Sequence, residues 1–172
     1  MIENVEVKRN RILTALVSRI QRVKRANYMG DSGLPYNNDI KLVLETLIQT
    51  VNLALEESPA VMLYTDAQTR FTPHNEPAGC YEAHWPIAVG FGMRDPEGKE
   101  LKDSRITRLL NSLAQDVDIA LHEGGLDLGI SQDVQLSLLT YQQDVYSDPE
   151  VGWAVSGYMV RYLHRSYRTE ED

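Results

Sequence analysis

Apolar residues recur every three or four positions in three segments of the chain, which is the spacing of an amphipathic helix. The three predicted helices lie within residues 1–26, 39–55 and 103–121. Asp39 is placed to cap the second helix, because its carboxylate can accept from the first free amides. Pro59 ends that helix, since proline disfavours helical geometry in the residue before it. Gly124 and Gly125 end the third helix, because glycine accepts left-handed backbone geometry.

Elsewhere the apolar period changes from about 3.6 to 2, which is typical of strands. Four strands are predicted, over residues 60–64, 87–93, 134–145 and 153–162. Residues 27–38 are rich in turn formers and are predicted to be a loop, and residues 66–80 a long hairpin loop or excursion. Hairpin pairs separated by a helix predict a single α+β domain over residues 1–172. Its sheet is expected to be largely antiparallel and four-stranded, packed with two to three helices.

Charge is unevenly distributed along the 172 residues. The chain has 17 Lys plus Arg and 25 Asp plus Glu, a formal net charge of −8. Residues 1–26 carry seven basic and two acidic residues, a net of +5, so the remainder carries −13. Lys8, Arg11, Arg19 and Arg22 recur at helical spacing and are expected on the face opposite the apolar stripe. This basic face could be simply solvated, could dock on an acidic partner, or could contact a nucleic-acid backbone. The acidic remainder argues against a dedicated DNA-binding protein.

The chain shows no pattern typical of a secreted or membrane protein. It has no apolar run of signal-peptide length near its start and no stretch of about 20 apolar residues. A single cysteine, Cys80, cannot form an internal disulfide, and a chain of this length needs none to hold a core. The expectation is a soluble protein of a reducing cytoplasm.

Catalytic and metal-binding patterns are weak. The four histidines stand far apart in sequence, and no paired cysteines accompany them. Asp116 and Asp118 are two positions apart on a predicted helix, so they project from different faces. Cys80 has His84 four residues away but no third residue to orient that pair. The glycine pairs lack a dinucleotide or phosphate-loop context. The sequence therefore predicts no enzyme, no metal and no cofactor.

The last predicted strand combines tyrosines with arginines, the residue types enriched at protein–protein contacts. One parity of this strand is expected in the core, and the other is expected to expose Tyr and Arg together. With the basic first helix, this predicts a subunit or partner interface. Its candidate residues are Lys8, Arg11, Arg19, Arg22, Arg70, Tyr158, Arg161, Tyr162 and Arg165.

The order of elements and several short phrases resemble the tail terminator (tail completion) proteins of long-tailed bacteriophages and the related minor tail proteins. The phrases are the N-terminal amphipathic helix, Pro59–Tyr64, Ile87–Asp95, Ile106–Leu110, the Asp148–Trp153 turn of the form Asp-Pro-x-x-Gly-Trp, and Val160–Tyr162. The likeness extends from Val5 to Arg168 and lies in the order of elements more than in a signature motif.

This resemblance implies a small structural subunit without enzymatic activity. Such a subunit assembles into a hexameric ring on the last ring of the tail tube, stops tube polymerisation and meets the head-side connector protein. DNA would pass through the ring without specific binding, and the protein would belong to the head–tail junction of a virion assembled in the host cytoplasm. Three alternatives remain open: another connector, adaptor or tube-type virion subunit; a nucleic-acid-binding module; and a small hydrolase using His84 or Cys80.

Overall fold

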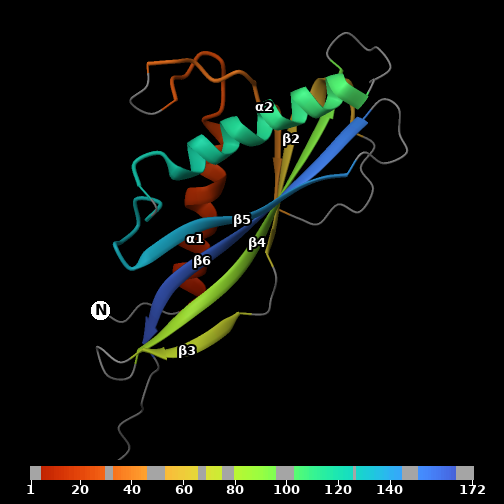
Figure 1. The fold of residues 1–172 in the computed structure, drawn as a ribbon. Helices are drawn as coiled ribbons and strands as arrows, with labels where there is room; N and C mark the ends of the chain where they lie inside the picture. The colour runs from red at the N-terminus through yellow and green to blue at the C-terminus, as the bar shows by residue number, and fades with distance from the viewer. Residues whose placement is uncertain are drawn as a thin grey trace, which may run out of the picture.

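The computed structural model describes residues 5–29, 33–45, 53–65, 69–74, 80–95, 103–125, 127–144 and 151–165. Within these ranges the chain forms two α-helices, a short 3-10 helix and a six-stranded sheet (Figure 1). In chain order the elements are α1 (Val5–Gln21), β1 (Leu42–Leu44), η2 (Leu55–Glu57), β2 (Ala60–Thr65), β3 (Arg70–His74), β4 (Cys80–Arg94), α2 (Asp103–His122), β5 (Val134–Asp144) and β6 (Val151–Arg165).

The sheet is built around the long antiparallel pair of β4 and β6. These strands pair over 15 positions, from Cys80 opposite Arg165 to Arg94 opposite Val151. The strand order is β1-β2-β4-β6-β5, and β3 pairs with the first part of β4. Among the described strands only the short β1–β2 pair is parallel. The outer strand β5 carries an irregularity in its register around Leu139.

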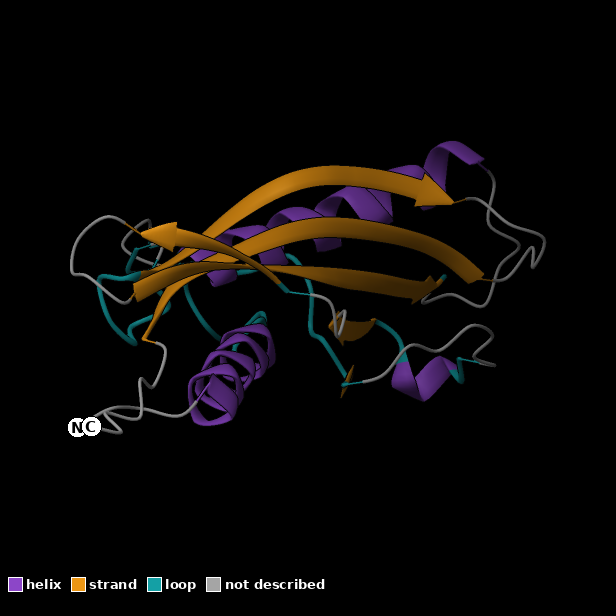
Figure 2. Cartoon of the chain, turned by 90° about the horizontal axis from the view of Figure 1, so that it is seen from below, coloured by secondary structure: helices purple, strands orange, loops and turns teal. Residues whose placement is uncertain are grey.

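Both helices pack on the same face of this sheet. The strands arch over α1, as Figure 2 shows. Apolar residues of α1 and α2 form one buried cluster with every second residue of β4 and β6. From the two strands these are Ala83, Trp85, Ile87, Val89, Phe91, Met93, Ala154, Tyr158, Val160 and Tyr162. Gly152 lies so close to α2 that an added Cβ would fall 2.0 Å from the Ile106 side chain.

The predicted α+β class and the largely antiparallel sheet are confirmed, but the predicted number of four strands is wrong. The structure adds β1 and β3. The segment over residues 66–80 was expected to be a loop or excursion, yet Arg70–His74 pair with β4. Residues 66–68 and 75–79 of that segment lie outside the described residues. Backbone pairing along the unusually long β4 brings this polar stretch into the sheet.

The helix predicted over residues 39–55 is wrong in its first part. Leu42–Leu44 form a strand in parallel register with the start of β2. The Lys41 amide donates to the Pro59 carbonyl at 2.8 Å, so bonds to the neighbouring chain segment replace the bonds of a helical turn. Residues 46–52 lie outside the described part of the chain. A short apolar run fits either period, and here strand pairing decides between them.

The predicted start of one helix and the predicted end of another can also be compared with the structure. Asp39 caps no helix, and its carboxylate instead accepts from the Arg25 amide at 2.7 Å. The glycines after α2 behave as expected. Gly124 and Gly125 have φ values of 76° and 111°, the left-handed region that glycine enters without a side-chain clash.

Candidate interaction surface

The basic face of α1 is largely occupied by contacts with its own chain. The Lys8 ammonium forms an ion pair with Asp133 and donates to the Leu163 carbonyl at 3.2 Å. The Arg19 guanidinium donates to backbone carbonyls at the end of α2. Arg22 lies 3.5 Å from the Glu123 carboxylate, although its side chain is 58% exposed. These three cations therefore hold α1 against the acidic body.

The Lys8–Asp133 pair is the most enclosed of these contacts. The two side chains are 13% and 27% exposed. Burial raises the pKa of Asp133, but hydrogen bonds from Lys8 and Ser131 outweigh that effect and hold the pKa below its usual value. Lys8 also lies 5.7 Å from the centre of the Tyr162 ring. The charge of Lys8 thus serves to anchor the first turns of α1.

Arg9 has a role that helical spacing did not indicate. Its Nε donates to the Tyr162 hydroxyl at 3.1 Å, and its guanidinium lies 5.1 Å from the centre of the Trp85 ring. A second guanidinium nitrogen donates to the Thr69 hydroxyl. These partners are 60 or more residues away in sequence, so no local pattern could have identified them.

Both tyrosines of the predicted interface are in the core. Tyr158 and Tyr162 are each 1% exposed, so the expectation that they are displayed on the surface is wrong. The physical reason is strand parity: both belong to the set of β6 side chains that faces the helices. The Tyr158 hydroxyl donates to the Asp118 carboxylate at 3.1 Å, and burial raises its pKa.

Arg11, Arg70 and Arg161 of the predicted interface lie outside the core. Arg11 is exposed on α1, and Arg165 is the last residue of β6. Arg161 lies on the sheet face away from the helices and donates to Gln135 at 3.1 Å. The strand register places Arg70 and Arg161 on either side of His84. The structure therefore brings two of the predicted arginines into one row across the sheet.

That second sheet face is the candidate interaction surface, and we call it the open face. At one end Leu53 covers it, in a small buried cluster with Ala60, Val151 and Trp153; over the rest of it the two described α-helices do not pack, because they lie on the other face. The open face presents the β4 and β6 side chains that alternate with the core positions, and it continues onto β2 and β5. Tyr64 is 39% exposed and Val155 is 43% exposed on it. The outward positions of a sheet face in water are typically polar, so these two exposed apolar side chains make this face the candidate contact surface.

Small residues make the middle of the open face shallow. Tyr64, Ala88, Gly157 and Thr140 lie in one register row across four strands, and Gly90 lies next to Val155 in the adjacent row. An added Cβ at Gly157 would lie 2.7 Å from the Thr140 hydroxyl, so a larger residue there would collide with β5. With few side chains in between, a partner could approach the strands closely.

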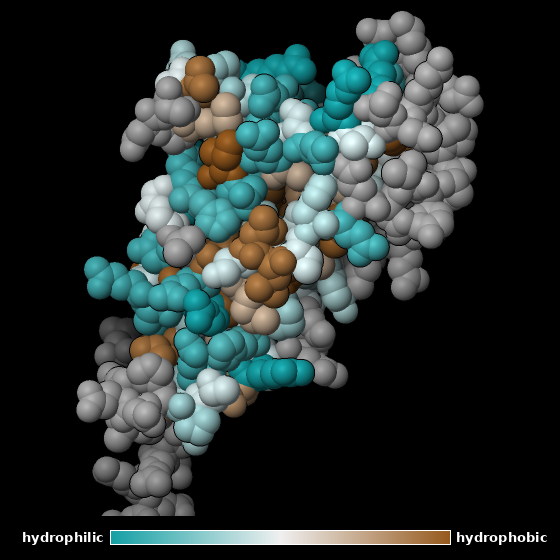
Figure 3. Space-filling model, in the orientation of Figure 1, coloured by the Kyte–Doolittle hydropathy of each residue, from teal (hydrophilic) through white to brown (hydrophobic). Residues whose placement is uncertain are grey.

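Exposed apolar residues also lie on β5, the outer strand of the sheet, where Leu138 is opposite Tyr158 and so belongs to the helix-bearing side. Leu138 is 45% exposed and Leu139 is 56% exposed, both at the irregularity of β5. Figure 3 shows apolar side chains gathered near the middle of the visible face, close to where β5 and β6 cross in Figure 1. An outer strand with exposed leucines has backbone groups and apolar area available to another chain.

The structure also describes the residues considered for catalysis and metal binding. Within the described ranges no three His, Cys, Asp or Glu side chains gather as metal ligands. Cys80 is buried, and His84 is paired with the Glu82 carboxylate at 2.9 Å.

The part of the chain that the structure describes contains no helix long and apolar enough to span a membrane.

One polar group of side chains joins α2 to β6. The Asp118 carboxylate lies 3.2 Å from His122 Nδ1 and accepts from the Tyr158 hydroxyl. The hydrogen bond with Asp118 raises the pKa of His122, and the same bond lowers the pKa of Asp118. The spacing of Asp118 and His122, four residues apart on a helix, is the sequence signal that could have identified this pair.

Searches with this sequence find no matching protein-family model and no matching curated protein. A function for the chain is therefore inferred from its own residues and their arrangement.

Proposed function

We propose that this protein is a structural virion subunit that acts as a tail terminator of a long-tailed bacteriophage. In this role it forms a hexameric ring on the end of the tail tube, stops tube polymerisation and joins the tube to the head-side connector. The single observation that carries the proposal is the open face: a sheet packed by helices on one side, with exposed Tyr64 and Val155 on the other.

Burial in an assembly explains this surface. An apolar sheet face gains free energy when a neighbouring subunit excludes water from it, at about 25 cal/mol per Å² of apolar area. A ring subunit also needs two different surfaces, one for each neighbour. The open face and the opposite, helix-bearing side differ in both shape and chemistry. Leu138 and Leu139 add exposed apolar area at the sheet edge, where a second contact can form.

The charges of α1 are consistent with a passive path for DNA. A DNA-binding helix needs cations that are available to phosphates. Lys8, Arg19 and Arg22 instead contact carboxylates or carbonyls of the same chain. A ring made from this subunit would let DNA pass without specific binding, and the alternative of a nucleic-acid-binding module is not favoured.

The test is ring formation and tube capping by the purified protein. Sedimentation and negative-stain microscopy, with and without the tail tube protein of the same virus, are expected to show rings of a single size. Added protein is expected to shorten tubes that are polymerising. Monomers that never bind tubes would overturn the proposal. Incorporation along the tube, without capping, would point to a tube-type virion subunit.

A matched pair of variants ties the assembly to the open face. Val155→Glu places a charge on the open face and is expected to abolish rings and capping. Gln115→Glu places the same charge at an exposed position on α2 and is expected to leave both unchanged. Equal behaviour of the two variants would show that the open face is not the interface.

A further inference from the structure

A cavity of about 250 Å³ lies on the helix-bearing side of the sheet, away from the open face. It lies between the segment that precedes β1, the start of β2, the end of β4 and α2. The residues that line it include three cationic ones, Arg25, Lys41 and Arg94, and one described acidic one, Asp39. The formal charge of this lining is therefore +2, in a chain whose net charge is −8.

The three cations come from separate parts of the chain. Arg25 follows α1, Lys41 precedes β1, and Arg94 ends β4. On a solvated helix face, charged residues lie close together because they recur at helical spacing in one segment. The residues of this cluster are distant in sequence, and the fold brings them together. Like charges brought together at a concave surface raise the local concentration of anions.

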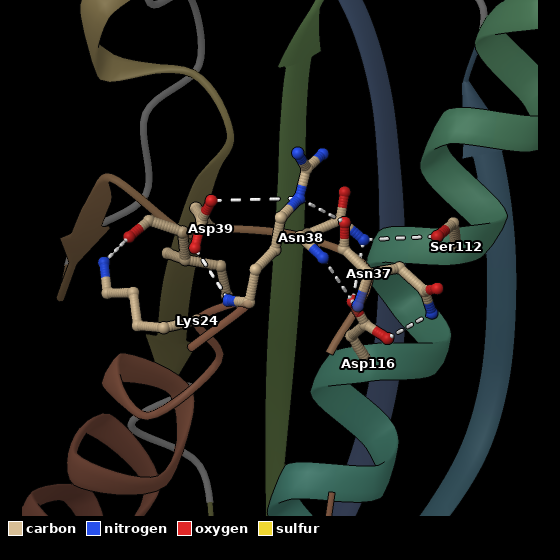
Figure 4. A network of polar contacts seen from close by, with 8 residues as sticks. Lys24, Asn37, Asn38, Asp39, Ser112 and Asp116 are labelled. Atoms are coloured by element: carbon tan, nitrogen blue, oxygen red, sulfur yellow. Dashed lines mark hydrogen bonds and ion pairs between the residues drawn. The ribbon is translucent and has the colours of Figure 1, made fainter. Parts of the chain in front are cut away.

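The wall that carries Asp39 and Lys41 is fixed on both sides. Figure 4 shows Asn37 and Asn38 bound to Asp116 of α2, while Lys24 binds the backbone on the other side. The Asn38 side-chain amide donates to Asp116 at 2.8 Å and to the Ser112 hydroxyl at 3.2 Å. The cavity is therefore preformed, which lowers the entropy lost on binding.

The three cations differ in the hydrogen bonds and ion pairs that they form with other residues of the chain. Asp39 lies 3.8 Å from the Arg25 guanidinium, whose Nε donates to the Asn37 carbonyl at 2.9 Å. Arg94 Nε donates to the Leu53 carbonyl. The Lys41 ammonium is exposed and has no hydrogen bond or ion pair with any described residue. Lys41 is thus the cation most available to a ligand.

We propose that this cavity binds an oxyanion, either a carboxylate or a phosphate group. Lys41 and the outward nitrogens of Arg25 would donate charge-assisted hydrogen bonds to it, and Arg94 would add positive potential. Asp39 orients Arg25 and leaves the site with a modest net charge, so we expect a dissociation constant in the millimolar range that weakens with added salt. The inference does not depend on ring formation.

The experiment is an NMR titration of the ¹⁵N-labelled protein at constant ionic strength. The probes are inorganic phosphate and glutarate, a dicarboxylate that resembles acidic side chains, with chloride as the reference anion. We expect saturable shifts of backbone amides at residues 38–41 and 94. Saturation by either probe supports the site, and the tighter probe identifies the source of the oxyanion. Shifts that do not saturate with either probe would overturn the proposal.

Variants distinguish binding at the cavity from a non-specific attraction of anions to positive charges of the protein. Lys41→Met and Arg25→Met each are expected to weaken binding about fivefold or more, since each removes one charge-assisted hydrogen bond. Arg70→Met removes the same charge near the opposite end of β4 and is expected to leave the dissociation constant unchanged. Equal weakening by all three variants would contradict the proposal.

Ring assembly gives an independent readout for the same variants. Because Lys41 and Arg25 lie away from the open face, both variants should form the same assemblies as the unchanged protein. If the variants lose phosphate or glutarate binding but assemble as the unchanged protein does, the anion site is confirmed. This holds whether or not the unchanged protein forms rings. Circular dichroism of each variant checks that the fold is retained.

Discussion

Replacing Asp116 with alanine is expected to destabilise the fold strongly. Asp116 is fully buried on α2, and its carboxylate accepts four hydrogen bonds from the Asn37–Asn38 segment. The donors are the backbone amides and side-chain amides of both asparagines, at 2.8 or 2.9 Å. Through these bonds α2 fixes the segment that leads from α1 to β1.

The size of the loss follows from the donors that Asp116→Ala leaves behind. Each buried donor without an acceptor costs about 1–3 kcal/mol. The Asn38 backbone and side-chain amides are buried, while water can reach the more exposed Asn37. Two buried donors plus a partial loss at Asn37 give about 3–5 kcal/mol. At about 2–4 °C per kcal/mol for a chain of this size, the melting temperature should fall by about 6–20 °C.

Urea unfolding followed by circular dichroism measures this change, with Gln115→Ala as the neighbouring exposed control. Asp116→Asn should be less damaging than Asp116→Ala, because its one oxygen can still accept from the three donors that bind Oδ2. If Asp116→Ala loses less than about 1 kcal/mol, or no more than the control, the proposed anchoring of the Asn37–Asn38 segment is refuted.

Three further changes test the packing, the charges and the pH response. Gly152→Ala should cost about 1–3 kcal/mol of unfolding free energy in the same urea assay, because its Cβ would collide with α2; an unchanged midpoint would contradict this. Lys8→Met and Asp133→Asn, combined in a double-mutant cycle, should show about 1 kcal/mol of coupling, and additive losses would show that the pair does not anchor α1. The raised pKa of His122 means that its bond with Asp118 stabilises the fold below about pH 6.5 and that this stability is lost as pH rises through the folded pKa. The stability difference between the unchanged protein and His122→Gln should therefore shrink from pH 6 to pH 9, and a constant difference would exclude the effect.

The elements that the sequence predicts well are those with long, regular apolar patterns. Over α2 the apolar repeat is sustained for about five turns and ends at two glycines, so local and tertiary preferences agree. The segment before β2 carries a regular helical repeat too, from Ile40 to Leu55, so a long repeat alone was not sufficient there. Its spacing suits a helix, but pairing with β2 gives Leu42–Leu44 a parallel neighbour. Such long-range pairing leaves no mark on the local period.

The candidate interface shows the same limit. Both parities of β6 contain large apolar or aromatic residues, so the alternation could not tell which side would face the helices. The helices cover the side of Tyr158 and leave Val155 exposed. The contacts of α1 were equally hidden, because Lys8 and Asp133 are 125 residues apart in sequence. The residue pattern of β6 could therefore predict a candidate interface on this strand, but it could not predict which of the two sheet faces would be exposed.

The contacts of α1 change what the charge asymmetry of the chain means. A net of +5 over residues 1–26 suggested a cationic surface for an acidic partner. Lys8, Arg19 and Arg22 are instead directed at groups of the same chain, and a cation held by its own chain contributes little to a second contact without breaking the first. Association of subunits should then depend mainly on apolar burial at the open face and respond weakly to salt. The oxyanion cavity should respond strongly, because its attraction is electrostatic. Salt dependence therefore separates the two proposed surfaces of one molecule.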